Sequence, residues 1–213
     1  VTTKAQSSEE YLDYLSREGE DTNEHYYVKI EAAKLLLDKA GIENYVITGT
    51  AKREDGASEG HMWNVVFIDG KPYNLDLTWD DPIGEGVTQN KRYAYFNITD
   101  EEILKTHTFS DASACRTATD SNYFVKLGRQ FDGYNAETKT ALSNMFGGHK
   151  SGDKLDVRFS SEDAYQRAID GLLKKEEIYR LLSIADAGKG GFSTTQINYI
   201  ADDTHCVIEF ILV

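Results

Sequence analysis

Two polar residues in the first half of the chain, His61 and Asp76, have the types and spacing that could support nucleophilic catalysis. Asp69-Gly70, which stands between them, is a strong signal for a two-residue β-hairpin turn. Such a turn places His61 opposite Thr78 and puts Asp76 one diagonal step away, about 7–8 Å at the backbone. An aspartate there can hold an imidazole in one tautomer and stabilise its protonated form, as in a nucleophile triad. An ordinary hydrogen-bonded pair between adjacent strands is the alternative.

The elements that must position this pair are a helix and three strands. Apolar residues recur at helical spacing before Gly41, which stands where a C-terminal glycine belongs. These apolar positions are Tyr26, Ile30, Ala33 and Leu37. Runs rich in β-branched and aromatic residues then predict strands over Tyr45–Ala51, His61–Ile68 and Tyr73–Trp79. The sequence therefore predicts a helix followed by antiparallel strands.

The pattern changes after a small, polar stretch at residues 107–121. A capping box at Thr99 opens a helix just before this stretch, and Ser160-Ser161-Glu162-Asp163 caps another helix after it. The other elements predicted beyond residue 121 are strands over Tyr123–Leu127 and Leu155–Phe159, helices over Ala136–Phe146 and Glu176–Ala185, and a strand pair formed by Ile197–Ile200 and Cys206–Leu212. We predict an α+β fold with two domains, residues 1–112 and residues 113–213.

Four motifs follow one another in the first predicted domain. They are Ala32-x-x-x-Leu36-Leu37-x-x-x-Gly41-Ile42, Val46-x-x-Gly49-x-Ala51, His61-x-Trp63-Asn64-x-Val66, and Asp69-Gly70-Lys71-x-Tyr73-x-x-Asp76-x-Thr78-Trp79-Asp80-Asp81-Pro82. Over residues 24–110 this series resembles the transglutaminase-like superfamily of papain-type cysteine hydrolases, which occurs in bacterial secreted and surface proteins. The resemblance implies a papain-like core of one helix packed on an antiparallel sheet, followed by a small α+β domain. It also implies a catalytic pair at His61 and Asp76 and an extracellular or cell-surface location.

The nucleophile that this resemblance implies is missing. The family places a cysteine at the N-terminus of the first core helix, where the helix dipole and a nearby imidazolium favour the thiolate. In this chain Tyr26 occupies that position, and of the family's Cys-x-Gly-Tyr-Ala-x-Ala-Phe pattern only Ala32 fits. A phenol with a pKa of about 10 is mostly protonated at neutral pH, so Tyr26 is a poor substitute. We therefore predict a remnant of a catalytic pair, and not a working enzyme.

The two cysteines, Cys115 and Cys206, leave one alternative open. Cys115 lies in a loop-like stretch after the core and could supply a relocated thiol, which would give an active cysteine peptidase or amidase. Cys206 lies in a strand pattern and is typical of a small buried hydrophobic residue. The pair permits a disulfide without requiring one. No cysteine or histidine has zinc-ligand spacing, and His107, His149 and His205 are scattered, so we predict neither a metal nor another cofactor.

Composition and aromatic residues indicate what the chain could bind. The net charge of −13 argues against nucleic acid and anionic membranes, and no apolar run approaches the length of a membrane span. Together with Tyr26, the residues Trp63, Asn64 and Trp79 surround the expected cleft, where aromatic rings can bind a peptide or sugar face. Core packing is the alternative, and it is favoured for Trp63. We predict a non-catalytic binding or structural module whose partner is a peptide, a protein or a cell-wall fragment.

Overall fold

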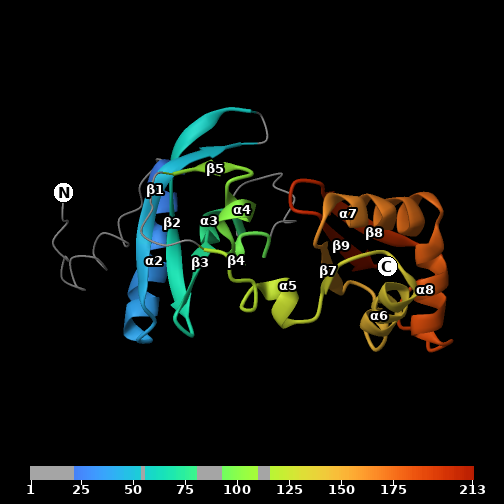
Figure 1. The fold of residues 1–213 in the computed structure, drawn as a ribbon. Helices are drawn as coiled ribbons and strands as arrows, with labels where there is room; N and C mark the ends of the chain where they lie inside the picture. Colours follow the sequence, from blue (N-terminus) through green and yellow to red (C-terminus); the bar gives the residue numbers. More distant parts are fainter. Residues whose placement is uncertain (1–21, 54–55, 81–92, 110–115) are drawn as a thin grey trace, which may run out of the picture.

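The structure is a computed structural model that describes residues 22–53, 56–80, 93–109 and 116–213, with side chains in the first helix from Lys29 onward. Two α+β units lie side by side, and each is built on its own sheet (Figure 1). The predicted α+β class is confirmed. Within the described ranges, every helix falls short of the length and hydrophobicity that crossing a bilayer requires.

The first unit consists of a long helix and a five-stranded antiparallel sheet in the order β4-β3-β2-β1-β5. Helix α2 packs against β1 and β2, and its buried residues include Ile30 and Ala33, as their helical spacing predicts. The elements are α2 (Thr22–Lys39), β1 (Asn44–Lys52), β2 (Ser58–Ile68), β3 (Lys71–Leu75), α3 (Leu77–Asp80), β4 (Phe96–Ile98), α4 (Asp100–Ile103) and β5 (His107–Thr108).

The turn between β2 and β3 is the predicted two-residue connection. Asp69 and Gly70 have φ angles of 52° and 74°, and a type I′ turn requires positive φ at both positions. The ladder pairs Ile68 with Lys71 and continues in the predicted register to Asn64 and Leu75.

The predicted strand over Tyr73–Trp79 is wrong beyond Leu75, where β3 ends. The Asp76 carboxylate accepts hydrogen bonds from the backbone N–H groups of Thr78 (3.0 Å) and Trp79 (3.2 Å). A side-chain oxygen that accepts from the first N–H groups of a helix is an N-cap, and here it begins α3. The same carboxylate therefore ends the strand and starts the helix.

The second unit has a four-stranded sheet in the order β6-β7-β9-β8, parallel between β6 and β7 and antiparallel elsewhere. Its elements are α5 (Tyr123–Lys126), β6 (Gln130–Phe131), α6 (Ala136–Phe146), β7 (Lys154–Phe159), α7 (Glu162–Ala168), the π-helical η1 (Ile169–Lys174), α8 (Glu177–Asp186), β8 (Ile197–Asp202) and β9 (Val207–Leu212). The strand predicted over Tyr123–Leu127 is wrong. Asn122 accepts a hydrogen bond from the Phe124 backbone N–H and caps a helical turn there instead.

Each unit has its own hydrophobic core. Buried residues of the helices α6, α7 and α8 and of the second sheet form one cluster, and two smaller clusters lie on the first sheet. The predicted boundary at residues 112 and 113 lies outside the described residues and stays a prediction. Residues 116–122 hydrogen-bond to the first unit, for example from Asn122 Nδ2 to the Phe96 carbonyl at 3.1 Å. This segment therefore joins the second unit to the first sheet.

Candidate functional site

His61 and Asp76 meet inside the first unit. His61 Nε2 lies 2.7 Å from Asp76 Oδ2, and both side chains are buried, with His61 only 3% exposed and Asp76 not exposed at all. The hairpin supplies this proximity, because β2 carries His61 and β3 ends one residue before Asp76. The carboxylate can hold the imidazole in one orientation, which is the geometry of a base and its orienting acid.

The surroundings of Asp76 keep its carboxylate ionised. Burial alone would raise the pKa of Asp76, but hydrogen bonding with His107 and His61 outweighs burial and lowers it. The two N–H groups of α3 fix Oδ1, so that Oδ2 faces the imidazoles. The backbone N–H of Asp76 donates to the Tyr95 carbonyl at 3.2 Å. Asp76 is therefore fixed in both position and charge.

His107 is the third member of this cluster, and sequence reasoning missed it. Its Nε2 lies 3.1 Å from Asp76 Oδ2, so both imidazoles face one carboxylate oxygen. The prediction that the other histidines are scattered is wrong for His107, since β5 pairs with β1 and carries this residue to the pair. Burial lowers the pKa of His107, and the contact with Asp76 offsets this only in part. No local spacing signals this contact, because a short edge strand creates it.

Aromatic rings enclose the three residues. The rings of Trp79, Trp63 and Tyr95 have centroids 4.7, 5.1 and 5.6 Å from that of His107. Trp79 is partly exposed, whereas Trp63 is fully buried and donates from Nε1 to Asn74 Oδ1 at 3.1 Å. Trp63 therefore has the contacts of a core residue.

Asn64, the next of the predicted binding residues, is fully buried as well. It donates to the Ile30 carbonyl at 3.3 Å and so ties α2 to β2. Neither Asn64 nor Trp63 presents surface to a ligand. Of the predicted binding residues whose side chains the structure describes, Trp79 is the one with appreciable exposure.

A second buried acid, Asp80, lies at the end of α3. Its Oδ1 accepts from the Tyr95 backbone N–H at 2.8 Å, and its Oδ2 is buried without a hydrogen-bond partner in the described part of the chain. Burial raises the pKa of Asp80 well above its ordinary value, and the charge of Asp76 adds to the increase, while the Tyr95 N–H lowers it. Two carboxyl groups close together thus differ in charge, with Asp76 ionised and Asp80 favouring its proton.

The thiols do not complete a triad in the described residues. Cys206 is a free, buried thiol whose side chain packs in the core of the second unit, as the strand pattern predicts, and burial raises its pKa. A buried thiol with a raised pKa is a poor nucleophile. Cys115 lies outside the described residues. Tyr26 lies within α2, beyond its first turn, but its side chain is also outside what the structure describes.

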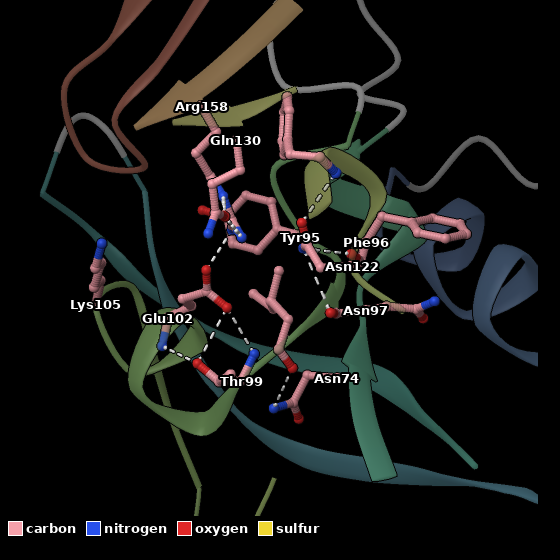
Figure 2. Close-up of polar contacts among 12 residues, drawn as sticks. Asn74, Tyr95, Phe96, Asn97, Thr99, Glu102, Lys105, Asn122, Gln130 and Arg158 are labelled. Carbon is pink, nitrogen blue, oxygen red and sulfur yellow. Dashed lines mark hydrogen bonds and ion pairs between the residues drawn. The ribbon is translucent and has the colours of Figure 1, made fainter. Parts of the chain in front are cut away.

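A separate cavity of about 840 Å³ lies between the two units, and neither His61 nor Asp76 lines it. Glu102 stands at its wall, where it completes the predicted capping box with Thr99 and pairs with Arg158 of β7. Figure 2 shows this arrangement, with Gln130 accepting from Arg158 Nε at 2.8 Å. The cavity is lined by polar groups of both signs, and the bond between Glu102 and Arg158 links the two units across it.

The sequence matches no protein-family model. It also matches no curated protein.

Proposed function

We propose that this chain is a non-catalytic module of the transglutaminase-like type, with a papain-like first domain that binds a peptide or a cell-wall fragment. The observation that carries the proposal is the buried contact of 2.7 Å between His61 Nε2 and Asp76 Oδ2. A base and its orienting acid are held together there, while the one described thiol belongs to another core. The motif residues around the pair support the same assignment.

The binding surface that we propose centres on Trp79. This ring is partly exposed and packs beside His61 and His107, at centroid distances of 5.7 and 4.7 Å. A large ring held by neighbouring rings can stack on a peptide or sugar face at a small cost in conformational entropy. The net charge of −13 favours neutral or cationic ligands over anionic ones.

Catalysis is tested with the purified chain. We expect no peptide hydrolysis, no amide hydrolysis and no amine incorporation into glutamine-containing peptides. The alternative of an active enzyme with a relocated thiol predicts activity that iodoacetamide and Cys115→Ser both abolish. Detection of such activity would overturn the proposal, and Cys206→Ser is the matched control because that thiol is buried in the second unit.

Binding is tested with soluble cell-wall muropeptides and short peptides, by calorimetry and by tryptophan fluorescence. The chain has two tryptophans, and we expect the ligand-induced change to disappear in Trp79→Phe. A purely structural role for the motif residues predicts no binding at all, together with a lower melting temperature in His61→Gln and Asp76→Asn. Lost binding in folded His61→Gln protein would support a ligand site.

A further inference from the structure

We propose that His61, Asp76 and His107 form a binding site for a divalent transition-metal ion, with Zn²⁺ as the preferred occupant. The inference rests on the geometry of these three side chains and does not depend on the proposed function. One ligand atom from each residue lies within 4.8 Å of the other two, and all three residues are buried. The two imidazole Nε2 atoms lie 2.7 and 3.1 Å from the same oxygen, Asp76 Oδ2.

The spacing of these atoms fits a small tetrahedral ion. Ligand atoms about 2.0–2.1 Å from Zn²⁺ in tetrahedral geometry are roughly 3.3–3.4 Å apart. The separations of 2.7 and 3.1 Å would therefore need to widen by about 0.6–0.7 Å and 0.2–0.3 Å. Three protein ligands leave a fourth position for water or a bound group.

The atoms behind the ligands hold them in place, as in known metal sites. Asp76 Oδ1 accepts from the N–H groups of Thr78 and Trp79, which leaves Oδ2 as the ligand atom. His107 Nδ1 lies 2.8 Å from Thr106 Oγ1. Metal-binding imidazoles almost always use their second nitrogen in this way, because the contact fixes both the ring orientation and the tautomer.

A metal ion bound at His107 Nε2 would replace the hydrogen bond of 3.1 Å between this nitrogen and Asp76 Oδ2. The contact of His107 Nδ1 with Thr106 Oγ1 would be kept.

The donor set selects the class of ion. Two imidazole nitrogens and one carboxylate oxygen suit Zn²⁺ and neighbouring first-row ions, whereas Ca²⁺ and Mg²⁺ require mostly oxygen ligands. Asp80 supplies an independent observation, because its Oδ2 is buried and without a hydrogen-bond partner among the described residues. An unsatisfied buried oxygen on α3, the helix that Asp76 caps, is accounted for if a water or an ion lies against it.

The experiment uses the full, untagged chain after removal of metal with a chelator. We expect one equivalent of Zn²⁺ to bind in calorimetry, one equivalent of Co²⁺ to give the visible absorption bands of a tetrahedral site, and the melting temperature to rise with Zn²⁺. His107→Gln should weaken binding by more than about 100-fold, since losing even an outer-shell partner costs 10–100-fold. His149→Gln is the matched control, because His149 pairs with Asp153 at the surface of the second unit.

Three results would overturn the site. The first is the absence of stoichiometric binding by the folded wild-type chain at micromolar Zn²⁺. The second is undiminished affinity in both His107→Gln and His61→Gln, with circular dichroism showing that these variants are folded. The third is loss of binding in Cys115→Ser, which would assign the ion to a thiol. If His107→Gln does not fold, Thr106→Val provides the second test, and we expect roughly 10–100-fold weaker binding with the ligands intact.

Discussion

The Asp76 carboxylate has four polar partners in the buried part of the first unit. Its two oxygens contact two imidazoles and two backbone N–H groups, and its side chain has no exposed surface. An ionised carboxylate is tolerated without water only when such partners replace hydration. Removing it takes a partner from each imidazole and the cap from α3.

We therefore expect Asp76→Ala to lower the free energy of unfolding by about 3–5 kcal/mol, the range for breaking a buried ionic pair. Urea denaturation measures the loss. Asp170→Ala is the control, because that carboxylate is exposed and pairs only at the surface with Lys175, so little change is expected. Equal stability of the two variants would contradict the role assigned to Asp76.

Asp80 predicts a dependence of stability on pH. Burial raises its pKa in the folded protein above the ordinary value of 3.8, so the folded state binds this proton more tightly than the unfolded state does. Stability from this group is complete below about pH 4 and is lost as the pH rises through the raised pKa. Asp80→Asn should remove that loss, so the free energy of unfolding of the variant should rise relative to that of the wild type as the pH increases. Denaturation at a series of pH values measures this difference. A difference between the two proteins that stays constant with pH would refute the prediction.

At the scale of elements, β5 determines whether His107 reaches the cluster. The strand has only two residues and pairs with β1 at Thr50 and Ala51. A Cβ atom on Gly49 would lie 2.1 Å from the Thr108 backbone carbonyl oxygen, so only glycine allows the two strands to approach this closely. The position of His107 thus depends on the absence of a Cβ atom at Gly49 in the neighbouring strand β1.

Gly49→Ala should displace β5 and lower the free energy of unfolding by about 1–3 kcal/mol, as overpacking does elsewhere. Gly60→Ala in β2 is the matched control, since a Cβ there meets no atom within 4 Å. The His107 ring signals in NMR spectra should shift in Gly49→Ala and stay unchanged in Gly60→Ala. Unchanged signals in both variants would show that β5 does not determine the position of His107.

Local sequence signals predicted those elements whose causes are local. The Asp69-Gly70 turn fixed the hairpin register, and the capping residues Thr99 and Ser161 begin helices where the sequence indicates. That register correctly brought His61 close to Asp76, but the pairing of His61 with Thr78 that it implied does not form, because β3 ends at Leu75. The strand predicted through Trp79 failed because Asp76 caps a helix at Thr78 and Trp79. The alternation of apolar and polar residues carries no information about such a side-chain hydrogen bond. The strand predicted from Tyr123 failed for the same reason at Asn122.

The contact of His107 with Asp76 could not be predicted in this way. It depends on pairing between β1 and β5, which are distant in sequence, and on the open space at Gly49. Both are properties of the assembled sheet. The sequence separation of His107 and Asp76 does not indicate their contact, because the contact forms only when β5 pairs with β1.

At the scale of the whole molecule, Glu102 connects the two units. One of its carboxylate oxygens completes the capping box with Thr99, and the other pairs with Arg158 of the second sheet (Figure 2). Arg158 is nine-tenths buried, so its guanidinium depends on Glu102 and Gln130 for partners. The link therefore satisfies a buried charge in one unit with an acid from the other.

Glu102→Gln should lower the free energy of unfolding by about 1–3 kcal/mol, because glutamine preserves the capping box but places an amide N–H₂ against the guanidinium. We also expect calorimetry to separate the melting of the two units more widely in this variant. Arg167→Gln, which removes an exposed ion pair with Asp163, is the control and should leave the melting profile unchanged. A single unchanged transition in Glu102→Gln would show that other contacts couple the units.

The tight turn at Asp69-Gly70 also has a consequence for the order of folding. His61 and Asp76 are 15 residues apart and can meet as soon as the hairpin closes, which takes about 1–10 μs for isolated hairpins. His107 is 31 residues from Asp76 and arrives only when β5 joins the far edge of β1. Substitutions in the turn should therefore slow refolding, whereas those in β5 should mainly speed unfolding, as stopped-flow kinetics can measure. We therefore expect the contact of His61 with Asp76 to form before His107 joins it.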